Sequence, residues 1–114
     1  MIAVQSNTGD LFRIDPATGE TARIDLEGDS LVAGDGLLRA GARLYVGRNT
    51  NVVDVVRLGA RSRSGRVTEE ITSPDFDVPT TVGRHGTRLY VIQARFDVVP
   101  TPDTPYWIAV APAH

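Results

Sequence analysis

Short apolar stretches alternate with polar turns along the whole chain. The stretches are rich in Val, Ile, Leu, Thr, Tyr and Phe, and Gly or Pro separates them at short intervals. This punctuation is typical of many short β-strands. The best helical candidate, residues 51–58 (NVVDVVRL), is short and β-branched, so we interpret it as a strand. The pattern therefore predicts an all-β protein.

One segment of this pattern occurs twice. Gly-x-Arg-Leu-Tyr-Val contains Arg43 in the first copy and Arg88 in the second, 45 residues later. Around the first copy the pattern predicts four strands, at residues 31–41, 43–49, 52–58 and 66–73. Around the second copy it predicts the first, second and third strands again, at 78–86, 87–95 and 106–112. The front of the chain fits the second, third and fourth strands, at 1–7, 10–15 and 20–25.

A four-stranded unit repeated at this period is the signature of β-propeller blades. We therefore expect one partial propeller domain of about two and a half four-stranded blades, with roughly ten strands. Its parts would be an incomplete blade at 1–27, a complete blade at 28–73 and an incomplete blade at 74–114. The alternative is a β-sandwich in which the two similar segments are accidental.

An open arc of blades has a physical problem at its two ends. Propellers close at about four to eight blades, and each blade has apolar side chains on both faces. A bare end face would be on the order of several hundred Å², near the upper limit for a monomer. We therefore expect missing blades of a longer chain, a homo-oligomer that covers the faces, or collapse into a sandwich.

The amino-acid composition limits the kinds of partner and the kinds of site chemistry that we expect. The 114 residues are 41% hydrophobic and 23% charged, and the net charge of −2 predicts neither a nucleic-acid nor a membrane partner. The absence of cysteine excludes disulfides and thiolate metal sites. The N-terminus lacks the pattern of a signal peptide, and no stretch approaches a membrane helix. We expect a soluble protein and leave its compartment open.

The stretch from Gly34 to Gly65 carries a family resemblance. It contains an Asp-Gly-hydrophobic motif, a Gly turn, Leu-Tyr-Val, a hydrophobic strand and a further turn. It resembles the C-terminal part of the gluconolactonase, senescence-marker-protein and luciferin-regenerating family of six-bladed propellers. The stretches LFRIDPATGE (11–20) and PTTVGRHGTRLYVIQAR (79–95) also resemble flanking blades of that family.

The resemblance implies a metal-dependent lactone or ester hydrolase. In that family one Glu, two Asn and one Asp hold a divalent metal, which here would be Ca²⁺, Mg²⁺ or Zn²⁺. The Asp of the motif is Asp35, and its carboxylate is a hard oxygen donor suited to such an ion. The Glu and both Asn have no counterpart in this chain, so we expect it to be inactive alone. Asp35 would otherwise be a turn residue that accepts hydrogen bonds from local amides.

A non-enzymatic function is the competing hypothesis. In this hypothesis the chain is a propeller module that self-associates, or binds a partner, through its exposed blade faces. It then has no cofactor, whereas the hydrolase hypothesis implies a small-molecule lactone as substrate. The catalytic residues of such a hydrolase are not identified by the sequence.

Several polar residues are further candidates. His85 lies in a predicted turn, and neither it nor His114 is accompanied by a G-x-S-x-G motif. The loop residues Arg61, Arg63 and Arg66 suit a phosphate or acidic partner, although a solvated loop is the simpler interpretation.

Further candidates lie at predicted strand ends. Asn49 and Asn51 would line a channel mouth or form Asx-turns, which we favour, and Asn7 occupies a similar place. Arg95 and Asp97 would contact a ligand or pair with each other, the latter being the simpler interpretation. We expect Tyr106 and Trp107 to pack between blades.

Overall fold

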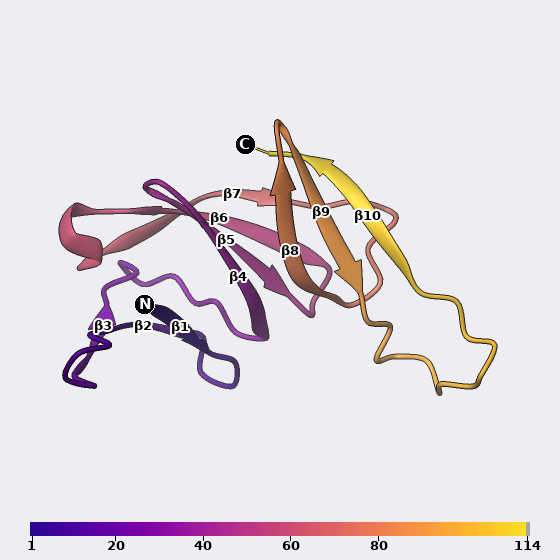
Figure 1. The fold of residues 1–114 in the computed structure, drawn as a ribbon, viewed down its shortest axis with the longest axis horizontal. Helices are drawn as coiled ribbons and strands as arrows, with labels where there is room; N and C mark the ends of the chain where they lie inside the picture. Colours follow the sequence, from indigo (N-terminus) through magenta and orange to yellow (C-terminus); the bar gives the residue numbers. More distant parts are fainter. Residues whose placement is uncertain (114) are drawn as a thin grey trace.

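The computed structural model describes residues 1–113, which contain ten strands in three antiparallel sheets (Figure 1). The first sheet has the order β1 (Ile2–Gln5), β2 (Asp10–Ile14) and β3 (Thr21–Ile24). The central sheet has the order β4 (Gly34–Ala40), β5 (Arg43–Arg48), β6 (Val52–Leu58) and β7 (Gly65–Ile71). The third sheet consists of β8 (Pro79–His85), β9 (Arg88–Gln93) and β10 (Trp107–Pro112). The predicted fold class, an all-β partial propeller, is confirmed.

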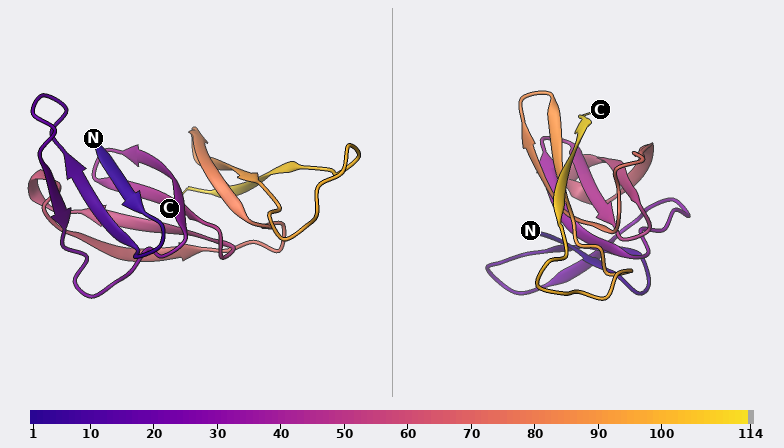
Figure 2. Two further views of the ribbon diagram at one scale, coloured as in Figure 1. Left: turned by 90° about the horizontal axis from the view of Figure 1, so that it is seen from below. Right: turned by 90° about the vertical axis from the view of Figure 1, so that its right-hand side faces the viewer.

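The three sheets follow one another as an open arc. Strand β4, the first strand of the central sheet, contacts β1 on one side and β8 on the other. Figures 1 and 2 show the first and third sheets at opposite ends, and the molecule measures 44 × 28 × 27 Å. One short 3₁₀ turn, η1 (Ala60–Ser62), interrupts the strands. Within residues 1–113, no helix has the length and apolar character needed to cross a membrane.

The repeated segment has the same structure in both copies. Strands β4 and β5 pair with a bulge between Gly34 and Leu37, and β8 and β9 pair with a bulge between Pro79 and Val82, 45 residues further on. Arg43 pairs with Ala40 in the first copy, as Arg88 pairs with His85 in the second. An accidental similarity does not predict this shared register.

Backbone conformation and hydrogen bonding repeat as well. The hairpin glycines Gly41 and Gly86 have φ of 62° and 60°, a left-handed conformation that glycine adopts at little cost. Arg39 Nε donates to Gly41 O at 3.1 Å, and Arg84 Nε donates to Gly86 O at 2.9 Å. The two copies are therefore equivalent down to single side-chain hydrogen bonds.

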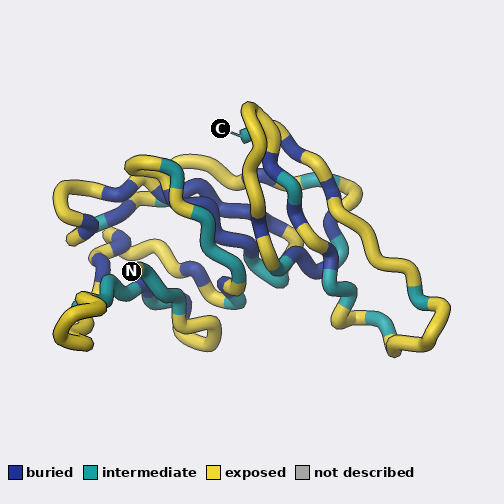
Figure 3. Tube along the Cα trace, viewed as in Figure 1, coloured by how far each residue is buried: buried dark blue, intermediate teal, exposed yellow. Residues whose placement is uncertain are grey.

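Two hydrophobic cores lie on opposite faces of the central sheet. Along β5, Leu44 and Val46 point into the core shared with the first sheet, whereas Tyr45 points into the core shared with the third sheet. Strand β6 is buried throughout except at Arg57 (Figure 3). The central sheet thus has the two apolar faces that a blade requires, and each face is covered by one neighbouring sheet.

Two glycines bring neighbouring blades into close contact. A Cβ atom on Gly36 would lie 2.4 Å from Thr80 O, and one on Gly47 would lie 2.5 Å from the same oxygen. Such distances are far below van der Waals contact. Strand β8 therefore packs directly against the backbone of β4 and β5 at this point.

We predict that Gly36→Ala destabilises the protein by about 1–3 kcal/mol, because the new methyl group forces β8 away from β4. The measurement is the free energy of unfolding from a denaturant titration. Gly83→Ala is the matched control, since its Cβ would meet no atom within 4 Å. Equal destabilisation by both substitutions would contradict this explanation.

Candidate functional site

The strand order places the connecting segments at two ends of the sheets. We call the end that carries residues 6–9, 30–33, 49–51, 72–78 and 94–106 the loop end. The opposite end carries the tighter connections at 15–20, 41–42, 59–64 and 86–87, and we call it the turn end. The sequence-predicted metal ligand, Asp35, lies at the loop end, at the second position of β4.

Asp35 is exposed and lies beside an asparagine of the central sheet. Asn49 Nδ2 donates to Asp35 Oδ2 at 3.3 Å and to the carbonyl of Pro79 at 2.9 Å. Within residues 1–113, no group of three or more His, Cys, Asp or Glu side chains is arranged to hold a metal ion. The structure thus brings one carboxylate and one amide together, and the role of Asp35 as a ligand stays a prediction.

Asn51 joins two blades instead of closing a local turn. Its Oδ1 accepts a hydrogen bond from the backbone N–H of Val78 at 2.8 Å, across 27 residues of sequence. Together with the bond from Asn49 to Pro79, it ties the β5–β6 loop to the start of the third sheet. The favoured interpretation of Asn51 as an Asx-turn residue is therefore wrong, because its Oδ1 is used in this bond between blades, whereas the interpretation of Asn49 stays a prediction. Asn7 is exposed.

Arg95 organises a polar cluster at the loop end of the third sheet. Its Nε donates to Asp77 Oδ2 at 2.9 Å, its Nη1 donates to Pro105 O at 2.9 Å, and its guanidinium carbon lies 4.8 Å from the centre of the Trp107 ring. We predicted Asp97 as its ion-pair partner, but the carboxylate that it contacts belongs to Asp77. Trp107 is stacked on this arginine, is 37% exposed and donates from Nε1 to Asp75 O at 2.8 Å, in the connection between the central and third sheets. Tyr106 is 55% exposed.

The two aspartates of the Arg95 cluster titrate differently. The hydrogen bond from Arg95 is the main reason that the pKa of Asp77 is lowered. The pKa of Asp97 is raised, chiefly because its carboxyl group shares a hydrogen bond with Asp77. As the pH rises, Asp97 therefore loses its proton at a higher pH than Asp77 does.

The backbone of this cluster is strained. Val78 has φ of 62° and Arg95 has φ of 53°, a region that a β-branched or bulky side chain rarely occupies. The two segments are joined by hydrogen bonds from Ala94 N to Val78 O at 2.9 Å and from Arg95 N to Asp77 O at 3.1 Å. Ala33, 45 residues before Val78, repeats the conformation with φ of 65°. The strain at Val78 is therefore a property of the blade repeat and does not by itself mark a catalytic site.

A buried ion pair lies between the first two sheets near the loop end. Asp54 is 1% exposed, and its Oδ2 lies 3.0 Å from Arg48 Nη1, whose Nε donates to Val32 O. Burial raises the pKa of Asp54 above its ordinary value of 3.8, and the hydrogen bond and charge of Arg48 counteract part of this effect. Glu70, directly opposite on β7, raises the pKa further.

The outer face of the third sheet is uncovered and apolar. We use this name for the cross-strand pairs Ile92–Ile108 and Tyr90–Val110, which point away from the core. Ile92, Ile108 and Val110 are 44%, 57% and 50% exposed. The bare end face that we predicted for the last blade is thus present in the structure.

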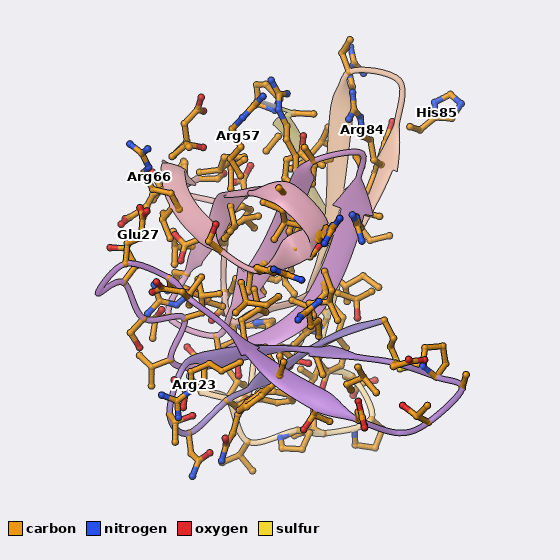
Figure 4. All side chains as sticks on the ribbon, turned by 90° about the vertical axis from the view of Figure 1, so that its left-hand side faces the viewer. Arg23, Glu27, Arg57, Arg66, Arg84 and His85 are labelled. Atoms are coloured by element: carbon orange, nitrogen blue, oxygen red, sulfur yellow. The ribbon has the colours of Figure 1, made fainter. Side chains whose placement is uncertain are left out.

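The other predicted side chains are dispersed. His85 is exposed at the tip of the β8–β9 hairpin beside Arg84, away from the Arg66–Glu27 ion pair of 3.5 Å (Figure 4). Arg63 is exposed, and Arg61 lines a cavity at the turn end. His114 lies outside the described residues.

Comparison with known proteins does not place the chain in a family. No family model, curated protein or solved structure matches it. The resemblance to gluconolactonases therefore stays a prediction, and the function has to be inferred from the geometry of the chain itself.

We predict that the pKa of Asp54, followed by carboxyl ¹³C NMR, lies above 3.8 and rises further in Arg48→Gln. Arg57→Gln removes an exposed arginine of the same strand and should leave this pKa unchanged. Because the folded-state pKa is raised, the contribution of Asp54 to stability is complete below pH 3.8 and is lost as the pH rises through the folded value. An unshifted pKa in the wild type would refute the role of burial.

Proposed function

We propose that this chain is a non-enzymatic propeller module that assembles with a second copy of itself through its uncovered blade faces. The observation that carries the proposal is the outer face of the third sheet. Its three most exposed members are branched aliphatic residues in register on adjacent strands. Soluble monomers rarely leave a contiguous apolar surface of this kind bare.

The opposite end of the arc offers a matching surface. By register, Ala3, Phe12 and Arg23 lie side by side on the face of the first sheet that points away from its core. Phe12 is half-buried, and Arg23 lies 3.7 Å from Asp10 at the loop end of the same face. This face is apolar in the middle and polar around it, which is the usual composition of an interface.

Charge supports a head-to-tail contact between these two faces. The exposed Arg84 and Arg88 lie at the turn end of the third sheet, and the exposed Asp15 and Glu20 lie at the turn end of the first sheet. In a ring all blades point the same way, so the turn end of one copy meets the turn end of the next. Opposite charges then face each other, which favours this pairing over that of two third sheets.

The number of sheets determines the number of copies. Each chain contributes three sheets, and propellers close at about four to eight blades. Two copies give six blades, whereas three copies would exceed this range. The proposed assembly is therefore a homodimer with six blades and two identical interfaces.

The free energy available is sufficient for a stable dimer. A blade face on the order of several hundred Å² corresponds to roughly 10 kcal/mol at about 25 cal/mol per Å², as an upper bound. Two such interfaces form together on closure. This gain exceeds the entropic cost of association of about 4–15 kcal/mol.

We predict that the wild type sediments at about twice its chain mass of 12.3 kDa and that Ile108→Glu sediments as a monomer. A carboxylate buried in the interface without a partner should raise the dissociation constant more than about 100-fold. Analytical ultracentrifugation over a range of concentrations measures both.

The control is Val99→Glu, which places the same charge at an 85% exposed position in the loop 94–106 and should leave the dimer intact. A wild type that is monomeric at all concentrations contradicts the proposal and favours missing blades of a longer chain as the cover. An oligomer that is equally stable in Ile108→Glu excludes this face as the interface.

A metal-dependent lactone hydrolase is the second candidate, and the exposed position of Asp35 at the loop end of β4 supports it. A carboxylate is a hard oxygen ligand that Ca²⁺ and Mg²⁺ accept. On this hypothesis Asp35 is a metal ligand and the metal polarises a lactone carbonyl. The innermost strand of the central blade carries Asp35, so closure of a ring would place it beside the channel.

This candidate predicts Ca²⁺- or Mg²⁺-dependent hydrolysis of a sugar lactone that is lost in Asp35→Ala. Calorimetric titration with each ion alone measures binding separately from turnover. Asp103→Ala, at another exposed aspartate of the loop end, is the control and should retain both properties. Absence of metal binding in the wild type would exclude the hydrolase and leave the assembly proposal unaffected.

A further inference from the structure

A cavity of about 370 Å³ opens at the turn end, between the first sheet and the central blade. Three arginines from three different elements line it: Arg13 on β2, Arg39 on β4 and Arg61 in η1. Its volume is within the range of small-molecule sites. The cavity is formed by a single copy of the chain and lies at the opposite end from Asp35, and two residues that line it, Asp15 and Glu20, also lie at the proposed interface.

Arg13 is the innermost of the three arginines. By register it lies beside Ile2 and Ala22, on the face of the first sheet that packs against the central blade. Its Nε is buried, and no hydrogen-bond partner for it is present within residues 1–113. A buried donor of a charged group without a partner is costly, so a ligand that accepts this hydrogen bond would be stabilised.

A hydrogen bond to a backbone carbonyl holds the Arg39 side chain in place. Its Nε donates to the carbonyl of Gly41 at 3.1 Å, which fixes the direction of the guanidinium group at the hairpin. Arg84 makes the same bond in the next blade but does not line the cavity. The two arginines therefore differ in surroundings while sharing their local geometry.

The backbone at Arg61 is strained. It has φ of 57°, and the following residue, Ser62, has φ of 53° and is buried. Two consecutive non-glycine residues in the left-handed region are unusual, and such strain is concentrated at functional sites. The strained turn η1 places Arg61 at the wall of the cavity.

Positive charge exceeds negative charge around the cavity. Asp15 and Glu20 also line it, but among the described residues no carboxylate lies within ion-pair distance of any of the three guanidinium groups. None of the three arginines has a carboxylate partner among the described residues, and Arg13 has a buried unpaired donor, so the cavity is suited to an external anion.

We propose that this cavity binds the phosphate group of a small, hydroxyl-bearing phosphate ester. The planar guanidinium fork matches phosphate oxygens in a bidentate geometry, and several arginines together neutralise a doubly charged anion. The carboxylates of Asp15 and Glu20 would accept hydrogen bonds from the hydroxyl groups of the ester, and they would repel a second anionic group. The ligand class is thus a monophosphate of a polyol or sugar.

The experiment uses inorganic phosphate and glycerol 3-phosphate as probes, added to the full chain and followed by ¹H–¹⁵N NMR. We expect saturable shifts at residues around the cavity, with glycerol 3-phosphate binding more tightly than inorganic phosphate. Arg39→Gln and Arg61→Gln should each weaken binding about 10-fold, as expected for the loss of a hydrogen bond from a charged group.

Arg63→Gln is the matched control, because it removes an exposed arginine of the same loop as Arg61 that does not line the cavity. It should leave the affinity unchanged. Shifts that do not saturate, or an equal loss in Arg63→Gln and Arg61→Gln, would overturn the proposal and indicate screening by a generally basic surface. Arg39 and Arg61 are exposed, so their variants test binding without disturbing the core that contains Arg13.

Discussion

A sheet with apolar side chains on both faces has to be covered on both sides, and the rest of this structure depends on that constraint. In the central sheet, consecutive residues such as Leu44 and Tyr45 enter opposite cores, and one neighbouring sheet covers each face. The first and third sheets also have two faces to cover, but each of them has only one neighbouring sheet. The exposed pair Ile92 and Ile108 is the direct result of ending such an array at the third sheet.

The blades are joined by two different kinds of contact. Near the inner strands, the absence of side chains at Gly36 and Gly47 lets β8 approach within van der Waals distance of the backbone. At the loop end, polar groups bridge from one blade to the next: Ser6 donates its hydroxyl to the carbonyl of Gly34, and Asn51 accepts from Val78 N. Direct backbone packing and hydrogen bonds thus both hold neighbouring blades together.

Much of the architecture was predictable from local pattern. The repeat that contains Arg43 and Arg88 predicts the strand order, because register and turn chemistry depend on residues close together in sequence. The partner of Arg95 was not predictable, since Asp77 is 18 residues away and Asp97 is the nearer carboxylate. The same holds for the three arginines of the turn-end cavity, of which only the loop residue Arg61 appeared as a candidate anion ligand. Three-dimensional proximity between elements leaves no mark in a single sequence.

The close contact at Gly36 and Gly47 has a consequence for assembly. A head-to-tail interface joins two different surfaces, so the contact alone does not terminate growth. Whether successive copies meet after one turn or continue as a helical filament depends on the rotation accumulated between blades. A side chain at either glycine would force β8 away from the central sheet and would change that rotation, and with it the closure of the ring.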